Sequence, residues 1–208
     1  MTKSPKKTKG QKNKDTTSEN NEIISIIIHG RGGQGAVTTG QLLAIAAFYD
    51  GKYTQSFPNF GVERAGAPAT AYCRISKEPI NIRSQVYNAD VGLVLDSSLF
   101  SAVKIVDKIK ENGILIVNTN KKAEELCLGP EAAKKNIKVI TVDATSIAMK
   151  IFNKPIINTA ILGAFSAKTK MVSIESLSKA IEEQLSSKGQ TLVKQNIDAV
   201  KQVYEKVQ

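Results

Sequence analysis

The chain has 208 residues, with 29 Lys or Arg against 19 Asp or Glu, so its formal net charge is +10. A chain of this length suits one domain with a sizeable core. Its two cysteines, Cys73 and Cys127, lie far apart and match no disulfide framework, zinc site or iron–sulfur run. No apolar run reaches the length of a membrane span, and no secretory signal is evident. These features predict a cytoplasmic protein with reduced cysteines, no metal site and no membrane contact.

The N-terminal segment differs in composition from the rest of the chain. Residues 1–21 contain almost no apolar residue and consist mainly of Lys, Thr, Ser, Asn and Gln. Because such a segment cannot offset its ordering entropy by burial, we predict a disordered, Lys-rich tail followed by a single domain over residues 22–208. The remaining chain is basic too, but its lysines are scattered, they are not interleaved with aromatic residues, and Trp is absent. This pattern favours a polyanionic small ligand or an acidic partner subunit over nucleic acid.

A strand pattern, a glycine cluster and a helix pattern follow one another between residues 23 and 49. The isoleucine-rich run at residues 23–28 is typical of a strand buried on both faces of a parallel sheet. Four glycines follow, which allow positive φ and close approach of a ligand, and residues 36–49 then have helical spacing. Free N–H groups and the dipole at such a helix start favour an anion, typically a phosphate. Arg31 adds a positive charge whose planar fork suits phosphate oxygens.

This glycine loop has competing interpretations. Gly30, Gly32 and Gly35 fit the G-x-G-x-x-G spacing of dinucleotide sites, but the next extended stretch lacks the acidic residue that a nicotinamide site requires about 20 residues later. No G-K-[ST] follows the glycines, so the loop is not a Walker loop. A tight turn without a ligand also explains the glycines. The number of glycines together with Arg31 favours a phosphate-binding loop.

A loop punctuated by Pro and Gly follows a short extended stretch at residues 53–57. It carries Phe60, Glu63 and Arg64 after Phe57, and two aromatic residues beside an ion-pair former are unusual in a mere connector. We therefore expect Phe60, Glu63 and Arg64 to form an interface or substrate loop. Alternatively, the two phenylalanines pin the loop to the core while the charged pair is solvated.

The middle of the chain contains mainly strand patterns. Residues 69–75 and 80–83 are typical of a hairpin. Residues 99–111 have helical spacing, and Gly113 ends the predicted helix. Uninterrupted apolar runs predict further buried strands at residues 91–95, 114–117 and 137–142.

The C-terminal part is predicted to be wholly helical. Its helices are expected at residues 147–152, at 159–167, from residue 173 onward, and at 192–207. Together with the preceding strands, this order predicts an α/β fold: an open, largely parallel Rossmann-like sheet flanked by helices, with a helical C-terminal part.

Polar residues follow three of the predicted strands, namely Asp96, Asn118 and Asp143. Open α/β sheets place ligand sites at this edge, but capping of the following helices explains the same residues, and we favour capping for Asp143. His29, the sole histidine, ends the first strand and is more typical of a hydrogen-bonded strand-end residue than of a catalytic base. Since no G-x-S-x-G elbow is present either, we assign no catalytic residue to this chain.

Several motifs together carry a family resemblance. They are G-R-G-G-Q-G at residues 30–35, followed by Thr38 or Thr39; F-P-N-F-G-V-E-R-A-G-A-P at 57–68; R-I-S at 74–76; Asp96; and N-T-A-I-L-G-A-F at 158–165. Jointly, over residues 23–207, they resemble the gamma subunits of pyruvate:ferredoxin oxidoreductase (pyruvate synthase) and of related 2-oxoacid:ferredoxin oxidoreductases. Family members often have E-R-R-G where this chain has E-R-A-G, which leaves any role of a second arginine open.

The resemblance implies a reaction and a division of labour. A 2-oxoacid, with pyruvate favoured by the second motif, reacts with coenzyme A to give acyl-CoA, CO2 and reduced ferredoxin. Thiamine diphosphate and [4Fe-4S] clusters would lie on partner subunits of the alpha, beta and delta types, and this chain would be inactive alone. It would present coenzyme A, using Gly30, Arg31, Gly32, Gly33, Gln34, Gly35 and Thr38. The alternatives are a purely structural gamma subunit and a nicotinamide-dependent oxidoreductase.

Overall fold

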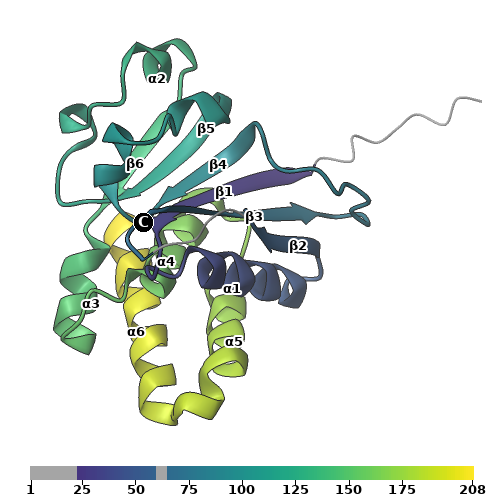
Figure 1. The fold of residues 1–208 in the computed structure, drawn as a ribbon. Coiled ribbons are helices and arrows are strands. Elements are labelled where there is room, and N and C mark those ends of the chain that lie inside the picture. Colours follow the sequence, from purple (N-terminus) through teal and green to yellow (C-terminus); the bar gives the residue numbers. More distant parts are fainter. Residues whose placement is uncertain (1–22, 60–64) are drawn as a thin grey trace, which may run out of the picture.

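The computed structural model describes residues 23–59 and 65–208. Within these residues, a six-stranded mixed sheet with the order β2-β3-β1-β4-β5-β6 forms the centre of the fold (Figure 1). Its strands are β1 (Ile24–Arg31), β2 (Tyr53–Pro58), β3 (Pro68–Ser76), β4 (Ala89–Val94), β5 (Ile109–Asn118) and β6 (Lys138–Val142). The predicted α/β class is confirmed. The proposed tail at residues 1–21 and the loop residues Phe60, Glu63 and Arg64 lie outside the described residues.

The strands β1, β4, β5 and β6 run parallel to one another. Ile26 and Ile27 of β1, whose side chains alternate between the two faces of the sheet, are both fully buried, as is Leu93 of β4. Burial on both faces explains why these strands are uninterrupted apolar runs. Because parallel strands share one carboxyl edge, the loops that follow them gather there.

The strand β3 lies between β1 and β2 and is antiparallel to both. The hairpin predicted between residues 69–75 and 80–83 is wrong, because residues 80–83 form no strand and β2 occupies the outer position. The backbone carbonyl groups of Ile82 and Ser84 accept hydrogen bonds from the Arg74 guanidinium. This interaction holds the segment against the face of the sheet instead of adding it to the ladder.

The longer helices lie on one side of the sheet (Figure 1). They are α1 (Ala36–Tyr49), α3 (Ala144–Phe152), α4 (Ile157–Thr169), α5 (Ile174–Leu185) and α6 (Gln190–Val207), while the short α2 (Pro130–Lys134) was not predicted from the sequence. Phe165 of α4 is fully buried, and a Cβ on Gly163 would lie 2.1 Å from the Val200 carbonyl oxygen of α6. This close approach explains the Ala- and Gly-rich sequence of α4. Among the described helices, none combines the length and the apolar character needed to cross a bilayer.

Irregular segments cover the opposite face of the sheet. The helix predicted over residues 99–111 is replaced by two 3₁₀ turns, Ser97–Ser101 and Val106–Lys108, and β5 begins at Ile109. Gly113 does not end a helix but lies within β5, where a Cβ would come 2.5 Å from Cγ2 of Ile109. Apolar residues that gave the helical spacing nevertheless contribute to a second core cluster: Leu99 and Ile109 belong to it, and Val103 packs against it. These side chains are buried from different local structures, and their spacing in the sequence resembles that of a helix only by coincidence.

Candidate functional site

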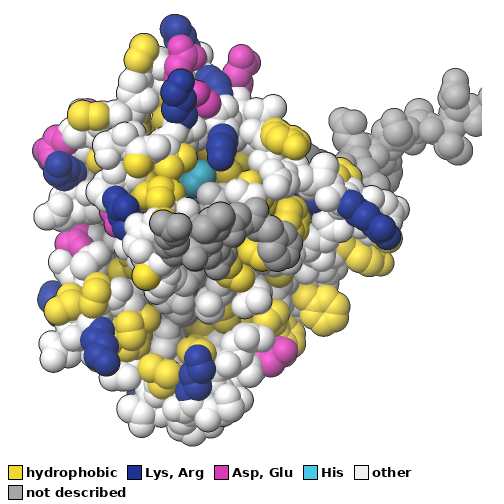
Figure 2. All heavy atoms as spheres, viewed as in Figure 1, with side chains coloured by type: hydrophobic (Ala, Val, Ile, Leu, Met, Phe, Trp, Pro, Cys, Tyr) yellow, Lys and Arg dark blue, Asp and Glu magenta, His cyan; other side chains and the backbone are white. Residues whose placement is uncertain are grey.

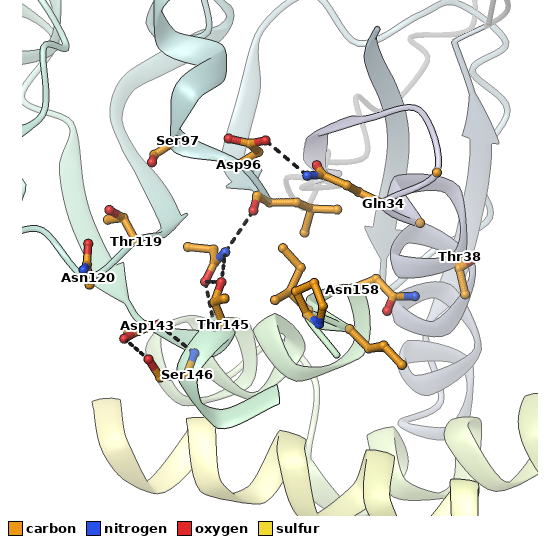
Figure 3. A pocket seen from close by; sticks show the side chains of 17 residues that line it. Gln34, Thr38, Asp96, Ser97, Thr119, Asn120, Asp143, Thr145, Ser146 and Asn158 are labelled. Atoms are coloured by element: carbon orange, nitrogen blue, oxygen red, sulfur yellow. Dashed lines mark hydrogen bonds between the residues drawn. The ribbon is translucent and has the colours of Figure 1, made fainter. Parts of the chain in front are cut away.

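A cavity of about 820 Å³ lies at the carboxyl edge of the parallel strands. The glycine loop after β1, the ends of β4, β5 and β6, and the N-termini of α1, α3 and α4 border it (Figure 3). Its apolar wall consists of Leu95, Pro155, Ile156 and Ile157. Its polar side chains are Gln34, Thr38, Asp96, Ser97, Asn118, Thr119, Asn120, Asp143, Thr145, Ser146 and Asn158. The cavity thus occupies the edge where open α/β sheets bind ligands.

Two glycines of the loop have the left-handed conformation that favours glycine. Gly33 has φ 92° and Gly35 has φ 82°. A Cβ on Gly35 would lie 2.8 Å from Nδ2 of Asn158, so this position brings the loop against the start of α4. A Cβ on Gly33 would meet no atom within 4 Å, which leaves its backbone open toward the cavity that it lines. The loop is therefore a packed junction at Gly35 and an accessible backbone at Gly33.

The N-termini of α1 and α4 border the cavity without side-chain caps. Gly35 at α1 and Ile156 at α4 make no side-chain capping hydrogen bond, and neither helix has an acidic residue in its first turn. Figure 3 shows Asn158 of α4 pointing toward α1 beside the loop. Both helix ends retain free N–H donors and a positive dipole end, which favour an anion.

The N-terminus of α3, by contrast, is satisfied by the chain itself. Asp143 accepts hydrogen bonds from the Ser146 backbone N–H at 2.9 Å and from the Ser146 hydroxyl at 2.5 Å. Burial raises the pKa of Asp143, but these hydrogen bonds, with the charges of Lys206 and Lys150, outweigh it and hold the pKa below its usual value. The capping role favoured for Asp143 agrees with this geometry.

Asn118 supports the same helix end from the neighbouring strand. Its Oδ1 accepts hydrogen bonds from the backbone N–H groups of Ala144 at 3.1 Å and Thr145 at 3.2 Å. Its Nδ2 donates to the Leu95 carbonyl at 3.0 Å and to the Thr145 hydroxyl at 2.9 Å. Asn118 therefore joins the ends of β4 and β5 to α3. The polar strand end was evident in the sequence, but the role of Thr145 was not.

Arg31 is bound within the protein. Its Nε donates to Asp96 at 3.0 Å, its Nη1 to the Gly66 carbonyl at 3.1 Å and its Nη2 to the Ser98 hydroxyl at 2.7 Å. Burial raises the pKa of Asp96, but hydrogen bonds from Ser98, Gln34 and Arg31 outweigh it and hold this pKa below its usual value. Arg31 does not line the cavity. Its guanidinium instead fixes the loop after β1 to the end of β4.

The predicted loop residues divide into two groups. Gly33, Gln34, Gly35 and Thr38 line the cavity, whereas Gly30, Arg31 and Gly32 do not. Thr38, not Thr39, reaches the cavity, because Thr39 is fully buried and its hydroxyl donates to the Gly35 carbonyl at 3.0 Å and the Asn158 carbonyl at 2.9 Å. Asn158 belongs to a recognised motif, but sequence reasoning did not assign it to the site.

His29 is buried away from the cavity. It is 1% exposed, its Nδ1 lies 3.3 Å from the Thr70 hydroxyl, and its Nε2 has no hydrogen-bond partner among the described residues. Burial, with a smaller contribution from the charge of Lys108, lowers the pKa of His29 to about 3. The imidazole is therefore neutral near pH 7, and its position agrees with a strand-end residue rather than with a catalytic base.

The fold and the cavity define an α/β domain of the open-sheet type with a cavity at the carboxyl edge of its parallel strands. Residues 25–206 match the protein family described as pyruvate ferredoxin/flavodoxin oxidoreductase, and the chain belongs to this family. It is 49% identical over 186 residues to the "Pyruvate/ketoisovalerate oxidoreductases common subunit gamma" of Pyrococcus furiosus, an alignment that covers 89% of this chain and 98% of the relative.

Solved structures show the same fold. Pyruvate oxidoreductase subunit PORC from Thermotoga maritima is 38% identical, with a TM-score of 0.73 over 88% of this chain and 96% of that chain. A 2-oxoglutarate:ferredoxin oxidoreductase from Magnetococcus marinus, whose structure holds 2-oxoglutarate, coenzyme A and succinyl-CoA, has a TM-score of 0.70. The match covers 89% of this chain and 32% of that chain at 20% identity, so it demonstrates similarity of fold alone.

Proposed function

We propose that this chain is the gamma subunit of a 2-oxoacid:ferredoxin oxidoreductase and that its cavity binds coenzyme A. The complex would convert a 2-oxoacid, most simply pyruvate, and coenzyme A into acyl-CoA and CO2, with two electrons passing to ferredoxin. The observation that carries the proposal is the pair of uncapped helix N-termini, those of α1 and α4, beside one cavity. Such ends provide N–H donors for phosphate oxygens without a side-chain cation.

The size of the cavity and the charges near it support a large anionic ligand. Its volume of about 820 Å³ lies in the usual range for cofactor sites. Among the described residues no Lys or Arg lines it, but an adjoining hollow of about 230 Å³ shares Thr119, Asn120 and Asp143 with it. That hollow is also lined by Lys121, Lys122 and Lys206. Coenzyme A has a pyrophosphate and a separate 3′-phosphate. One of these groups would bind at the helix N-termini in the cavity, and the other at the lysine ammonium groups of the adjoining hollow.

The relatives favour the same ligand. A subunit common to pyruvate and ketoisovalerate oxidoreductases, as the P. furiosus relative is named, serves reactions whose acids differ. Coenzyme A is the substrate that such reactions share. A gamma subunit that presents coenzyme A, while another subunit selects the acid, accounts for this sharing.

Thiamine diphosphate and the iron–sulfur clusters belong to partner subunits in this proposal. A [4Fe-4S] cluster takes about four cysteine thiolates, whereas this chain has Cys73 and Cys127 only. Cys73 is buried, and burial raises its pKa to about 12, so it is not a ready thiolate ligand. Partners of the alpha, beta and delta types would therefore supply electron transfer to ferredoxin, and the lone chain would not turn over.

The test compares two glycines that both have a positive φ. Gly33 and Gly51 both have positive φ, 92° and 74°, and a Cβ at either would meet nothing within 4 Å. Only Gly33 lines the cavity. In the assembled complex, Gly33→Val should raise the KM for coenzyme A by about 10- to 100-fold, or about 1.4–2.7 kcal/mol, whereas Gly51→Val should leave it unchanged.

The other functions predict different outcomes. A structural subunit without a ligand would leave the KM for coenzyme A unchanged in both variants. A nicotinamide site would show as direct binding of NADH, and not of coenzyme A, to the purified complex. A rise in the KM for the 2-oxoacid alone would assign the glycine loop to the other substrate.

A further inference from the structure

Arg74 is a buried cation near the C-terminal end of β3. It is 3% exposed and pairs in register with Ser25 of β1 and Gln55 of β2. Because side chains alternate along a strand, Arg74 lies on the same face as Tyr72, which belongs to the core cluster opposite the long helices. The cavity at the carboxyl edge does not include it.

The polar partners of Arg74 are uncharged. Its guanidinium donates to Oε1 of Gln55 at 3.2 Å and to the carbonyl groups of Ile82 and Ser84, and it lies 5.2 Å from the centre of the Phe57 ring. Burial lowers its pKa. Buried charges in proteins are usually compensated by an opposite charge. Among the residues that the structure describes, no carboxylate pairs with Arg74.

A hollow of about 330 Å³ opens beside this guanidinium. We call it the Arg74–Arg83 hollow; it is lined by Gln55, Ser56, Phe57, Arg74, Ile82 and Arg83. None of these residues is acidic, and the exposed Arg83 brings a second cation to the rim. Two guanidinium groups beside an aromatic ring and an aliphatic wall match the carboxylate and the methylene carbons of a Glu or Asp side chain.

The surroundings of the hollow have the character of an interface. β2 is an edge strand, so its outer backbone groups are open to pairing. Tyr53 at its start is 50% exposed, and Ile82 is 41% exposed. In Figure 2, hydrophobic and basic side chains lie next to each other at the margin that β2 and β3 occupy in Figure 1. Exposed aromatic residues and arginines are typical of protein interfaces.

We propose that the Arg74–Arg83 hollow receives an acidic side chain of a partner subunit. Charge complementarity selects the group, since the described residues that line the hollow supply two cations and no anion. The open edge strand and the exposed apolar residues select a polypeptide over a free small acid. The inference rests on the proposed role as a subunit but not on coenzyme A binding, so either can fail without the other.

A zero-length cross-link tests the contact directly. Arg83→Lys places an amine at the rim, which a carbodiimide joins to a carboxylate in direct contact. In the purified complex, mass spectrometry should find an amide between position 83 and an Asp or Glu of another subunit. Asn81→Lys, at an exposed position near the hollow but outside its lining, should give no such product. Absence of the product for Arg83→Lys, or a product within this chain alone, would overturn the inference.

Charge reversal provides a second, independent measurement. Arg83→Glu should weaken association of this chain with the rest of the complex by at least about tenfold, because it sets two carboxylates against each other. Lys188→Glu, an equal change at an exposed position between α5 and α6, should have no effect. Unchanged association for Arg83→Glu would overturn the proposal. If the KM for the 2-oxoacid also rose in that variant, the hollow would be assigned to a small acid instead of a partner subunit.

Discussion

The helix ends around the cavity differ in how their N–H groups are satisfied. α3 is closed by Asp143 and by Asn118, which together accept hydrogen bonds from the first turn. α1 and α4 border the same cavity without side-chain caps. A helix end that is capped needs no ligand, whereas an uncapped end needs water or an anion. Under the proposed function, we therefore expect the phosphate groups of coenzyme A on the side of α1 and α4 and not on the side of α3.

The largest expected effect comes from adding a side chain at Gly35, where the glycine loop packs against the start of α4. Gly35→Ala adds a Cβ at φ 82° and 2.8 Å from Nδ2 of Asn158, so either the Asn158 side chain or the loop must shift. We expect a loss of about 1–3 kcal/mol in the free energy of unfolding. The KM for coenzyme A should rise by about 100-fold, or about 2.7 kcal/mol. Urea unfolding and steady-state kinetics measure the two effects.

A double variant separates the steric contact with Asn158 from the backbone strain at position 35. Asn158→Gly removes the side chain that the new Cβ would meet, so adding it to Gly35→Ala should recover part of the lost stability. Equal stability of the single and the double variant would show that Asn158 does not enforce glycine at position 35.

The next effect concerns the capped end. Asn118→Ala leaves the N–H groups of Ala144 and Thr145 and the carbonyl of Leu95 without their partner. An unmet buried polar group costs about 1–3 kcal/mol, so the variant should unfold at clearly lower urea concentration. Asn120→Ala, at an exposed position lining the same cavity, is the control and should be neutral. Equal stability of the two variants would contradict the role given to Asn118.

A second comparison, between a helix that packs on the sheet and a segment surrounded by loops, explains how much of the fold could be predicted. α1 has the predicted bounds because its apolar face packs on a continuous sheet and Asp50–Gly51 end it. Residues 99–111 gave a false helix because their apolar side chains are buried one by one by loops. Spacing in the sequence reports burial, and it reports a helix only where the neighbouring surface is continuous.

The candidate site was predictable where its residues are close in sequence. The glycine loop formed a local pattern, and four of its predicted residues line the cavity. The pairing of Arg31 with Asp96 joins residues 65 positions apart, so no local pattern shows that the guanidinium has a partner within the chain. Similarly, Thr145 enters the site through Asn118 on another strand. These contacts depend on strand order, which the sequence did not specify.

A smaller effect concerns the acid sensitivity of the Arg31–Asp96 pair. The pKa of Asp96 is lowered in the folded chain, so its contribution to stability is present above the unfolded value of about 3.9 and is lost as the pH falls below it. Partly exposed ion pairs contribute about 0.2–1 kcal/mol. Asp96→Asn should therefore be less stable than the parent by about this amount at pH 7, and the gap should narrow as the pH falls below about 3.9. A gap that persists at low pH would assign the loss to packing.

The smallest effect should come from the charge of Asp143 alone. Asn caps helices about as well as Asp, so Asp143→Asn should retain the bond to Ser146 while removing a carboxylate from both the cavity and the lysine-lined hollow. A nearby exposed charge is worth about 0.3–1 kcal/mol, so the KM for coenzyme A should fall by about two- to fivefold. Asp143→Ala removes the same charge but also the cap, and should show the same KM with a loss of about 1 kcal/mol in stability. An unchanged KM in both variants would mean that the phosphates of the ligand do not approach α3, and binding would then be confined to the side of α1 and α4.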